Sequence, residues 1–442
     1  MPTEFYFVLD YFTLFIKSWW WIFAPLILWK PALFLYLQWR VDVFLQKQTM
    51  VILEIKLPRD MAKPIRAMEV VLSSIHAGIY QPPDFWEKWI DGQVQLSLAI
   101  EMVSIEGRPH FFIRTPLQYR DTVESSIYAQ YPEVELVEVE DYTKHIPQSV
   151  PNKEWDLFGT DYKLMKEEFY PIKTYPEFEK ESAFESVEER KVDPIAALLE
   201  GMAKIKKGEQ LWLQFILEPV GDADMPKSLS QWYKKGETFR DKLARRPGAP
   251  PPPRPVTVDA LDLLLTGHSP QEKKEEKEII PPEMKLTPGE RDALAAIEKK
   301  MSKPIFRSVV RFIFLGQRNV WFKPNFRVLF SYFNQYTTNN LNALFPLGKT
   351  LTKVKKSVFF PPINIPFIRN RRIFIKGRKL FRVYIKRLSY FHPHPTKGTY
   401  MLNVEELASL FHLPSQITAS APGMERIDIR KKTQPPGLPM EE

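Results

Sequence analysis

The amino-acid sequence predicts an α+β fold in which a long apolar N-terminal segment precedes two βαββαβ units, the second split by a proline-rich insertion. Three observations lead to this prediction. Only three charged residues interrupt the run from residue 5 to residue 39, the same order of strands and helices then occurs twice, and prolines gather between residues 247 and 255. With 442 residues and 44% apolar content, the chain is long enough for several domains with buried cores.

The first 45 residues are the predicted membrane anchor. A bilayer-spanning helix needs about 20 apolar residues, which the run provides. Its tryptophans suit the membrane–water interfaces, and they are Trp19, Trp20, Trp21, Trp29 and Trp39. Acids precede the run and cations follow it, which favours a cell-membrane protein with the bulk of the chain in the cytoplasm. A secretory signal peptide and a helix lying in the interface are the two alternatives.

Residues 46–145 form the first predicted unit. Val51, Leu53, Ile55 and Leu57 alternate as in a strand, and apolar residues at helical spacing follow from Ile65 to Ile75. A second strand turns at Glu106-Gly107 into a third, and a helix and a last strand (134–139) complete the order. The order βαββαβ is that of the ferredoxin-like fold.

The second predicted unit consists of residues 160–220 and 301–348. We expect a strand within 169–178, a helix starting at Pro194 and a strand over 211–217. Strands over 305–315 and 319–322 then pair, and a helix follows from Phe326. Between them, residues 221–300 form the insertion, in which residues 221–280 bury no face and Thr287 caps a helix that reaches residue 300.

Three segments close the chain: a basic segment (349–400), a helix (401–416) and a flexible tail (417–442). Within the first, residues 363–388 are expected to form two short strands around a Lys376-Gly377 turn, or an irregular basic segment. The helix has Asn403 as its N-cap and Glu405 and Glu406 in its first turn.

No enzyme site or cofactor site is visible in the sequence. The absence of cysteine excludes disulfides, thiolate metal sites and cysteine nucleophiles. ALFPLGKT, residues 343–350, matches a loose phosphate-loop pattern, but Phe345 and Pro346 replace the glycine-rich turn, so a structural turn is the better interpretation. His392 and His394 lack the further ligands that a metal needs nearby. We therefore expect no catalytic residue, no metal and no cofactor.

Positive charge is concentrated between residues 301 and 400, which contain twenty Lys and Arg residues and no Asp or Glu, whereas the whole chain has a net charge of +9. Such a block attracts phosphate groups of nucleic acid or lipid, or an acidic protein, unless it is merely a solvated face. Interleaved aromatic residues favour nucleic acid, and a nearby membrane favours anionic lipid. The candidate binding residues are Lys353, Lys355, Lys356, Arg369, Arg371, Arg372, Lys376, Arg378, Lys379, Arg382, Lys386 and Arg387.

Two segments resemble bacterial conjugative DNA-transfer proteins of the type IV secretion coupling class. LNVEELASLFHLP (402–414) is similar to the segment before their motor domain, with a tail resembling KKTQPPGLP (431–439). YAQYPEVELVEVEDYT (128–143) resembles the region upstream. In that class an ATPase with a phosphate loop follows, whereas this chain ends at Glu442, so no catalytic residue is carried over.

The resemblance implies a non-enzymatic, membrane-anchored component of a type IV secretion or conjugation-like system. Its basic surface would contact DNA or a separately encoded motor ATPase. The alternative is a membrane scaffold whose basic segment binds anionic lipid headgroups. The sequence leaves open whether the protein forms an oligomer.

Overall fold

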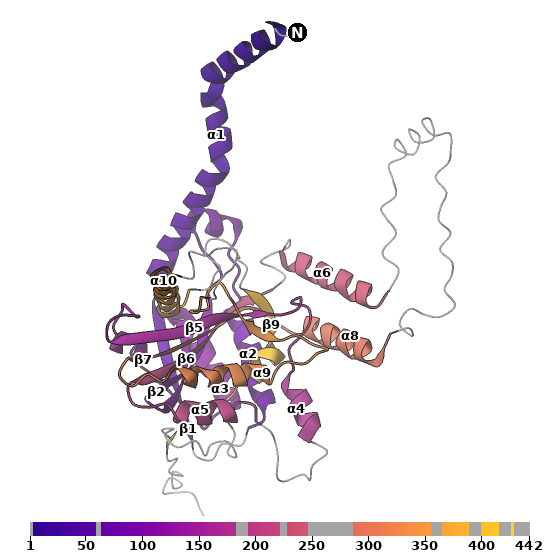
Figure 1. Ribbon diagram of the computed structural model, residues 1–442. Coiled ribbons are helices and arrows are strands. Elements are labelled where there is room, and N and C mark those ends of the chain that lie inside the picture. Colours follow the sequence, from indigo (N-terminus) through magenta and orange to yellow (C-terminus); the bar gives the residue numbers. More distant parts are fainter. Residues whose placement is uncertain are drawn as a thin grey trace, which may run out of the picture.

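The computed structural model describes residues 3–58, 63–182, 193–221, 228–245, 286–354, 365–388, 399–414 and 426–427. The α+β fold is confirmed within these ranges, because nine strands pair antiparallel in one sheet and helices cover both of its faces (Figure 1). The short β10 adds to β1 in parallel. The strands are β1 (Met50–Pro58), β2 (Leu98–Ile105), β3 (Arg108–Pro116), β4 (Glu135–Glu138), β5 (Trp155–Leu164), β6 (Glu209–Val220), β7 (Ile305–Gln317), β8 (Leu344–Pro346), β9 (Tyr400–Asn403) and β10 (Arg426–Ile427).

The first half of the sheet has the strand order β4-β1-β3-β2. Its elements begin and end within a few residues of the predicted positions, with helices α2 (Ile65–Ile79) and α3 (Arg120–Gln130) between the strands. The predicted turn between β2 and β3 is confirmed, since Glu106 and Gly107 have φ angles of 53° and 85°. Such positive φ angles suit glycine and make this two-residue hairpin possible.

The second half has the order β6-β7-β5-β8, and β2 pairs with β6 to join the halves into one sheet. The predicted strand within 169–178 is wrong: its place is taken by β5, which begins at Trp155. β5 is hard to recognise in the sequence because it contains Gly159 and the buried Asp161. The predicted strand over 319–322 is also wrong, because these residues form a turn and the start of a loop after β7.

Two hydrophobic cores lie on opposite faces of the sheet. The larger one lies beneath α2, α3, α5 (Ala196–Ala203), α9 (Arg327–Asn334) and α11 (Val404–Leu410). The smaller one lies beneath α10 (Pro366–Ile385) and the segment from Tyr142 to Val150, which includes η3 (Tyr142–His145). Figure 1 shows α10 on one side of the sheet and α3, α5 and α9 on the other. The remaining short helices are η1 (Glu87–Asp91), η2 (Leu117–Tyr119), α4 (Tyr175–Ser182) and η5 (Lys323–Phe326).

Two helices lie in the described part of the predicted insertion, residues 228–245 and 286–300. They are α6 (Ser228–Leu243) and α8 (Pro288–Met301), and the predicted capping box at Thr287 and Glu290 is present. The expectation that residues 221–280 bury no face is wrong for α6, because Trp232 is 5% exposed and packs with Phe169 and Ile297 in a third core.

The C-terminal helix is part of the core. β9 pairs with β7, and every residue of α11 is buried, including Glu405 and Glu406. The predicted cap is confirmed, since the Glu406 backbone N–H donates to Asn403 Oδ1 at 2.8 Å. The predicted tail (417–442) lies outside the described residues except for β10.

The predicted anchor forms one helix, α1 (Thr3–Lys47), which projects from the body (Figure 1). Among the described residues, no helix has the length and apolar character needed to cross a bilayer. The apolar run predicted as the membrane anchor contains Lys17 and Lys30, and α1 also contains Pro25 and Pro31.

Candidate functional site

The basic helix α10 carries most of the predicted binding residues. The prediction of two strands with a Lys376-Gly377 turn is wrong, since both residues lie inside a helix of 20 residues that begins with Pro366. One face of this helix is buried, through Gly377, Leu380, Phe381 and Tyr384. These positions have the i, i+3, i+4, i+7 spacing of a helix that packs against a surface.

Packing against the sheet fixes the orientation of α10. The Trp212 ring of β6 lies 5.2 Å from the Tyr384 ring and 6.3 Å from the Phe381 ring, measured between centroids. A Cβ atom at Gly377 would come 3.2 Å from the Pro151 ring, so glycine permits a close approach here. Phe381 and Tyr384 belong to the aromatic residues that are interleaved with the cations of the basic block. Their packing shows that they are core residues.

The opposite face of α10 is exposed and strongly basic. The predicted cations that are exposed on it are Arg371, Arg372, Arg378, Lys379, Arg382 and Lys386. Phe367, Phe374 and Ile375 are exposed among them, at 73%, 40% and 54%. Within the described part of the chain, this face combines six cations with apolar side chains, which is typical of helices that bind membrane surfaces.

The remaining predicted cations differ in their surroundings. Arg369 is partly buried, and Lys353 is exposed on the loop before α10. Lys376 is also partly buried, and its Nζ donates to the carbonyl oxygens of Gly348 and Leu351 at 3.1 and 3.2 Å. Burial, and next the charge of Arg372, lower the pKa of Lys376. Lys355 and Lys356 lie outside the described residues.

Arg387 is not a surface residue, so its prediction as a binding residue is wrong. Its side chain is 2% exposed, and its guanidinium donates to Glu101 at 3.0 Å and to Asp141 at 3.0 Å. Burial alone would raise the pKa of Asp141, but the hydrogen bonds and charge of Arg387 outweigh it and hold the pKa below its usual value. Burial and the charge of Arg387 lower the pKa of Arg114 to about 10.

A row of buried polar residues crosses four neighbouring strands beneath the C-terminal end of α10. Register places them directly opposite one another in the order Asp161, Arg311, Gln214, Glu101. Arg311 donates to Asp161 at 2.6 Å and to the carbonyl oxygen of Leu388 at 3.3 Å. Arg311 also donates to the carbonyl oxygen of Val383, in the last turn of α10, at 3.3 Å, so the row ties the end of α10 to the sheet.

The N-terminal helix adds an exposed apolar surface. Of the predicted anchor residues, Trp19, Trp29 and Trp39 are 49%, 66% and 58% exposed. Trp20 and Trp21 belong to α1, but their side chains are outside the described part. In Figure 1, α10 lies at the side of the body from which α1 projects. The exposed apolar helix and the basic helix therefore face the same side in this view.

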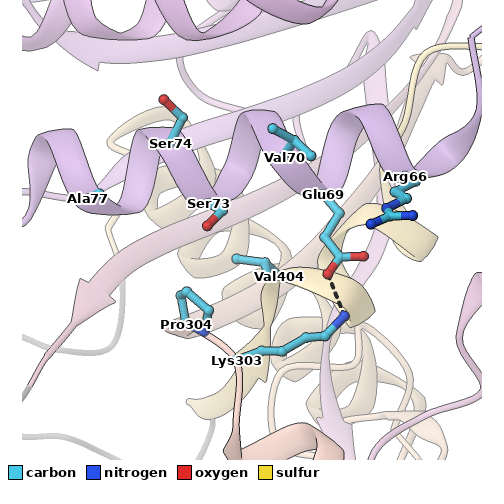
Figure 2. Close-up of a pocket in the computed structure, with 9 residues that line it drawn as sticks. All are labelled: Arg66, Glu69, Val70, Ser73, Ser74, Ala77, Lys303, Pro304 and Val404. Carbon is cyan, nitrogen blue, oxygen red and sulfur yellow. Dashed lines mark hydrogen bonds and ion pairs between the residues drawn. The ribbon is translucent and has the colours of Figure 1, made fainter.

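A pocket of about 490 Å³ lies elsewhere, between α2, α11 and the start of β7 (Figure 2). Lys303 bridges the carboxylates of Glu69 and Glu405 in its wall. The pocket is lined by Arg66, Glu69, Val70, Ser73, Ser74, Ala77, Lys303, Pro304 and Val404. Because its lysine and its glutamate are already paired with one another, the pocket offers Arg66 as its remaining charged group.

The turn predicted for the segment from Ala343 to Thr350 is present only in its last three residues, 348–350. Leu344–Pro346 form β8, and a turn follows instead of the helix that a phosphate loop requires. Thr350 Oγ1 accepts a hydrogen bond from the backbone N–H of Asp161, with a distance of 3.0 Å between nitrogen and oxygen. His392 and His394 lie outside the described residues, within which no cluster of three or more His, Asp or Glu side chains is placed to hold a metal ion.

Comparison with models of protein families gives a match over most of the chain. Residues 45–425 match the model of a domain of unknown function, DUF8128. A search of the curated proteins found no match. The matched range extends from the end of α1 through the nine antiparallel strands, α10 and α11, and ends just before β10. The chain therefore belongs to the DUF8128 family.

Proposed function

We propose that this protein is a non-enzymatic, membrane-associated scaffold in which α1 holds the chain at a cell membrane and the basic face of α10 binds anionic lipid headgroups. The folded body then lies on the cytoplasmic side. The observation that carries the proposal is the composition of the exposed face of α10, where six cations surround Phe367, Phe374 and Ile375. Each cation near an anionic surface adds about 1 kcal/mol of attraction.

The exposed residues of α1 support the same proposal. Along its described length, nine large apolar side chains are 43–73% exposed. They are Leu14, Phe15, Trp19, Ile27, Leu28, Trp29, Leu35, Tyr36 and Trp39. So many exposed large apolar side chains mark a site of contact with a membrane or with another protein. The basic face of α10 favours the membrane, since anionic headgroups complement it.

The test replaces three exposed cations of one helical face, Arg371, Arg378 and Arg382, by glutamine. We expect binding to vesicles containing anionic lipid to weaken roughly 100-fold in a flotation assay. The control replaces three exposed lysines outside α10, Lys163, Lys206 and Lys207, by glutamine and should bind like the wild-type protein. Equal weakening in both triple variants would show that net charge, and not α10, determines binding.

A second proposal keeps the resemblance to conjugative coupling proteins. In it the protein is a component of a type IV secretion-like DNA-transfer system, and α10 contacts DNA or a separate motor ATPase. Arg378 lies 5.0 Å from the centre of the Phe374 ring, and such an exposed pair can stack on unpaired bases. Single-stranded DNA that displaces the protein from anionic vesicles would favour a contact with DNA, whereas DNA without effect would exclude that contact and leave only the one with a motor ATPase.

We also propose that the sheet is built from two ferredoxin-like units. The support is the strand order: β4-β1-β3-β2 in one half and β8-β5-β7-β6 in the other follow the same sequence of connections. β2 and β6 occupy the same place in their respective units, and the pairing between these two strands joins the units. A single rigid sheet of this kind suits a scaffold, because it fixes the positions of α1 and α10 relative to one another.

A further inference from the structure

Three apolar side chains protrude from the segment between α2 and β2. Phe85, Trp86 and Ile90 are 65%, 69% and 50% exposed. The Phe85 ring lies 5.7 Å from the Trp86 ring and 5.8 Å from the Trp89 ring, measured between centroids. We call Phe85, Trp86 and Ile90 the aromatic tip. It belongs to none of the buried clusters of the described residues, so packing within the chain does not explain it.

Local interactions hold the aromatic tip in place. The Asp84 backbone N–H donates to Glu87 Oε2 at 2.9 Å, which closes the first turn. Gly92 ends η1 with a φ angle of 71°, a conformation that favours glycine. A Cβ atom at Gly92 would lie 2.4 Å from the carbonyl carbon of Arg40, so the end of η1 is pressed against α1.

This contact places the aromatic tip beside the apolar surface of α1. Tyr36 and Trp39, which lie within one turn of Arg40, are 43% and 58% exposed, and their rings are 6.3 Å apart. The exposed apolar surface of α1 is therefore continued by a second element of the fold. Aromatic side chains with an apolar body and a polar edge are enriched at membrane–water interfaces.

We infer that the aromatic tip inserts into the membrane interface next to α1. The inference rests on the proposed membrane association and adds a second contact to it. Charge distinguishes the two contacts: η1 and Asp84 together carry three acids and one lysine, namely Asp84, Glu87, Asp91 and Lys88. This segment has a net negative charge and is not attracted to anionic lipid, so its contribution depends on apolar burial and does not weaken as the salt concentration rises, unlike that of α10.

The absence of cysteine allows the inference to be tested on the full chain with single-cysteine variants. Ile90→Cys, Trp29→Cys and Val70→Cys are labelled with an environment-sensitive NBD group and mixed with vesicles containing anionic lipid. Ile90 reports on the aromatic tip while leaving Phe85 and Trp86 intact, and Trp29 reports on α1. The control is Val70, which is 44% exposed on α2. This helix covers the face of the sheet opposite to α10.

We expect the emission of the labels at positions 90 and 29 to shift to the blue on vesicle binding, and that of the label at 70 to stay unchanged. A shift at 29 without one at 90 overturns the inference but leaves the proposed membrane association intact. No shift at any position overturns both. Shifts at all three positions indicate non-specific adsorption and also overturn the inference.

A second measurement tests the energetic contribution of the aromatic tip. In the Trp29→Cys background, Phe85→Ser combined with Trp86→Ser should weaken vesicle binding roughly tenfold or more, because two large apolar side chains lose their burial in the interface. The weakening should be the same at low and high salt. Unchanged binding of this variant, with an unchanged circular dichroism spectrum, contradicts the inference.

Discussion

Replacing Arg387 by alanine should destabilise the fold strongly, although the residue lies in the most basic segment of the sequence. Its guanidinium contacts Glu101 through Nε and Nη2, at 3.0 and 3.2 Å, and Glu101 is fully buried. Removal of the arginine leaves the Glu101 carboxylate without its cation and the Asp141 carboxylate without its guanidinium partner. Breaking one side of such a buried pair costs about 3–5 kcal/mol of unfolding free energy.

Arg382→Ala is the matched control, because Arg382 lies on the exposed face of the same helix. A substitution at such a position changes stability by about 0.5 kcal/mol or less. The assay is urea unfolding of the full chain, followed by circular dichroism. Arg387→Ala should unfold at a much lower urea concentration than Arg382→Ala, and Glu101→Gln should reduce the difference. Unfolding of the two arginine variants at the same urea concentration would refute the structural role of Arg387.

Two further predictions concern the sheet and the C-terminal helix. Gly159→Ala should lower the free energy of unfolding by about 1–3 kcal/mol, because the new Cβ atom would lie 2.4 Å from the carbonyl oxygen of Phe312. The control is Gly348→Ala, whose Cβ atom would have no neighbour within 4 Å and which should leave the unfolding free energy nearly unchanged. Burial raises the pKa of Glu405, but Lys299 and Lys303 outweigh this and hold it below the usual value. The pKa of Glu405 is thus lower in the folded state than in the unfolded state. The stabilisation by its ion pairs is therefore fully present above the unfolded-state pKa of about 4.3, and it is lost as the pH falls through the folded-state pKa. Glu405→Gln should therefore flatten the loss of stability as the pH falls below about 5. An unchanged pH profile of the unfolding midpoint would contradict the proposed role of the lysines.

Local sequence patterns were sufficient to predict the first half of the sheet. Its strands alternate apolar and polar residues, Glu106-Gly107 supplies the turn, and Pro64 precedes α2 directly. Each signal acts within a few residues, and all of them agree. The same holds for the caps at Thr287 and Asn403, where a side-chain oxygen and a glutamate three residues later form a capping box.

The errors occur where distant residues determine the structure. β5 contains Gly159, which approaches the β7 backbone closely, and Asp161, whose burial depends on Arg311 far along the chain. Gly377 and the many β-branched and aromatic residues of α10 are typical of a turn between strands. In the structure they form a helix, and Gly377 allows this helix to pack closely against Pro151. The helical spacing from Gly377 to Tyr384 is the signal that could have identified it.

The candidate site was predicted in part. The exposed cations of α10 were identified by composition alone, because no acid lies within the basic block. Composition could not separate Arg387 from them, since its partners Glu101 and Asp141 are more than 240 residues away. The aromatic tip was missed because a short segment between two prolines and a glycine resembles an ordinary loop until the contact of Gly92 with α1 is known.

The measurement that tests the proposed function most directly is the binding of the intact chain to two kinds of vesicle in the same buffer. One kind contains anionic lipid and the other only zwitterionic lipid. We predict binding to anionic vesicles that is at least roughly 100-fold tighter at low salt, a ratio that falls toward one as the salt concentration rises. Equal binding to both kinds of vesicle at low salt, or binding to neither, would contradict the assignment of α10 as a headgroup-binding helix.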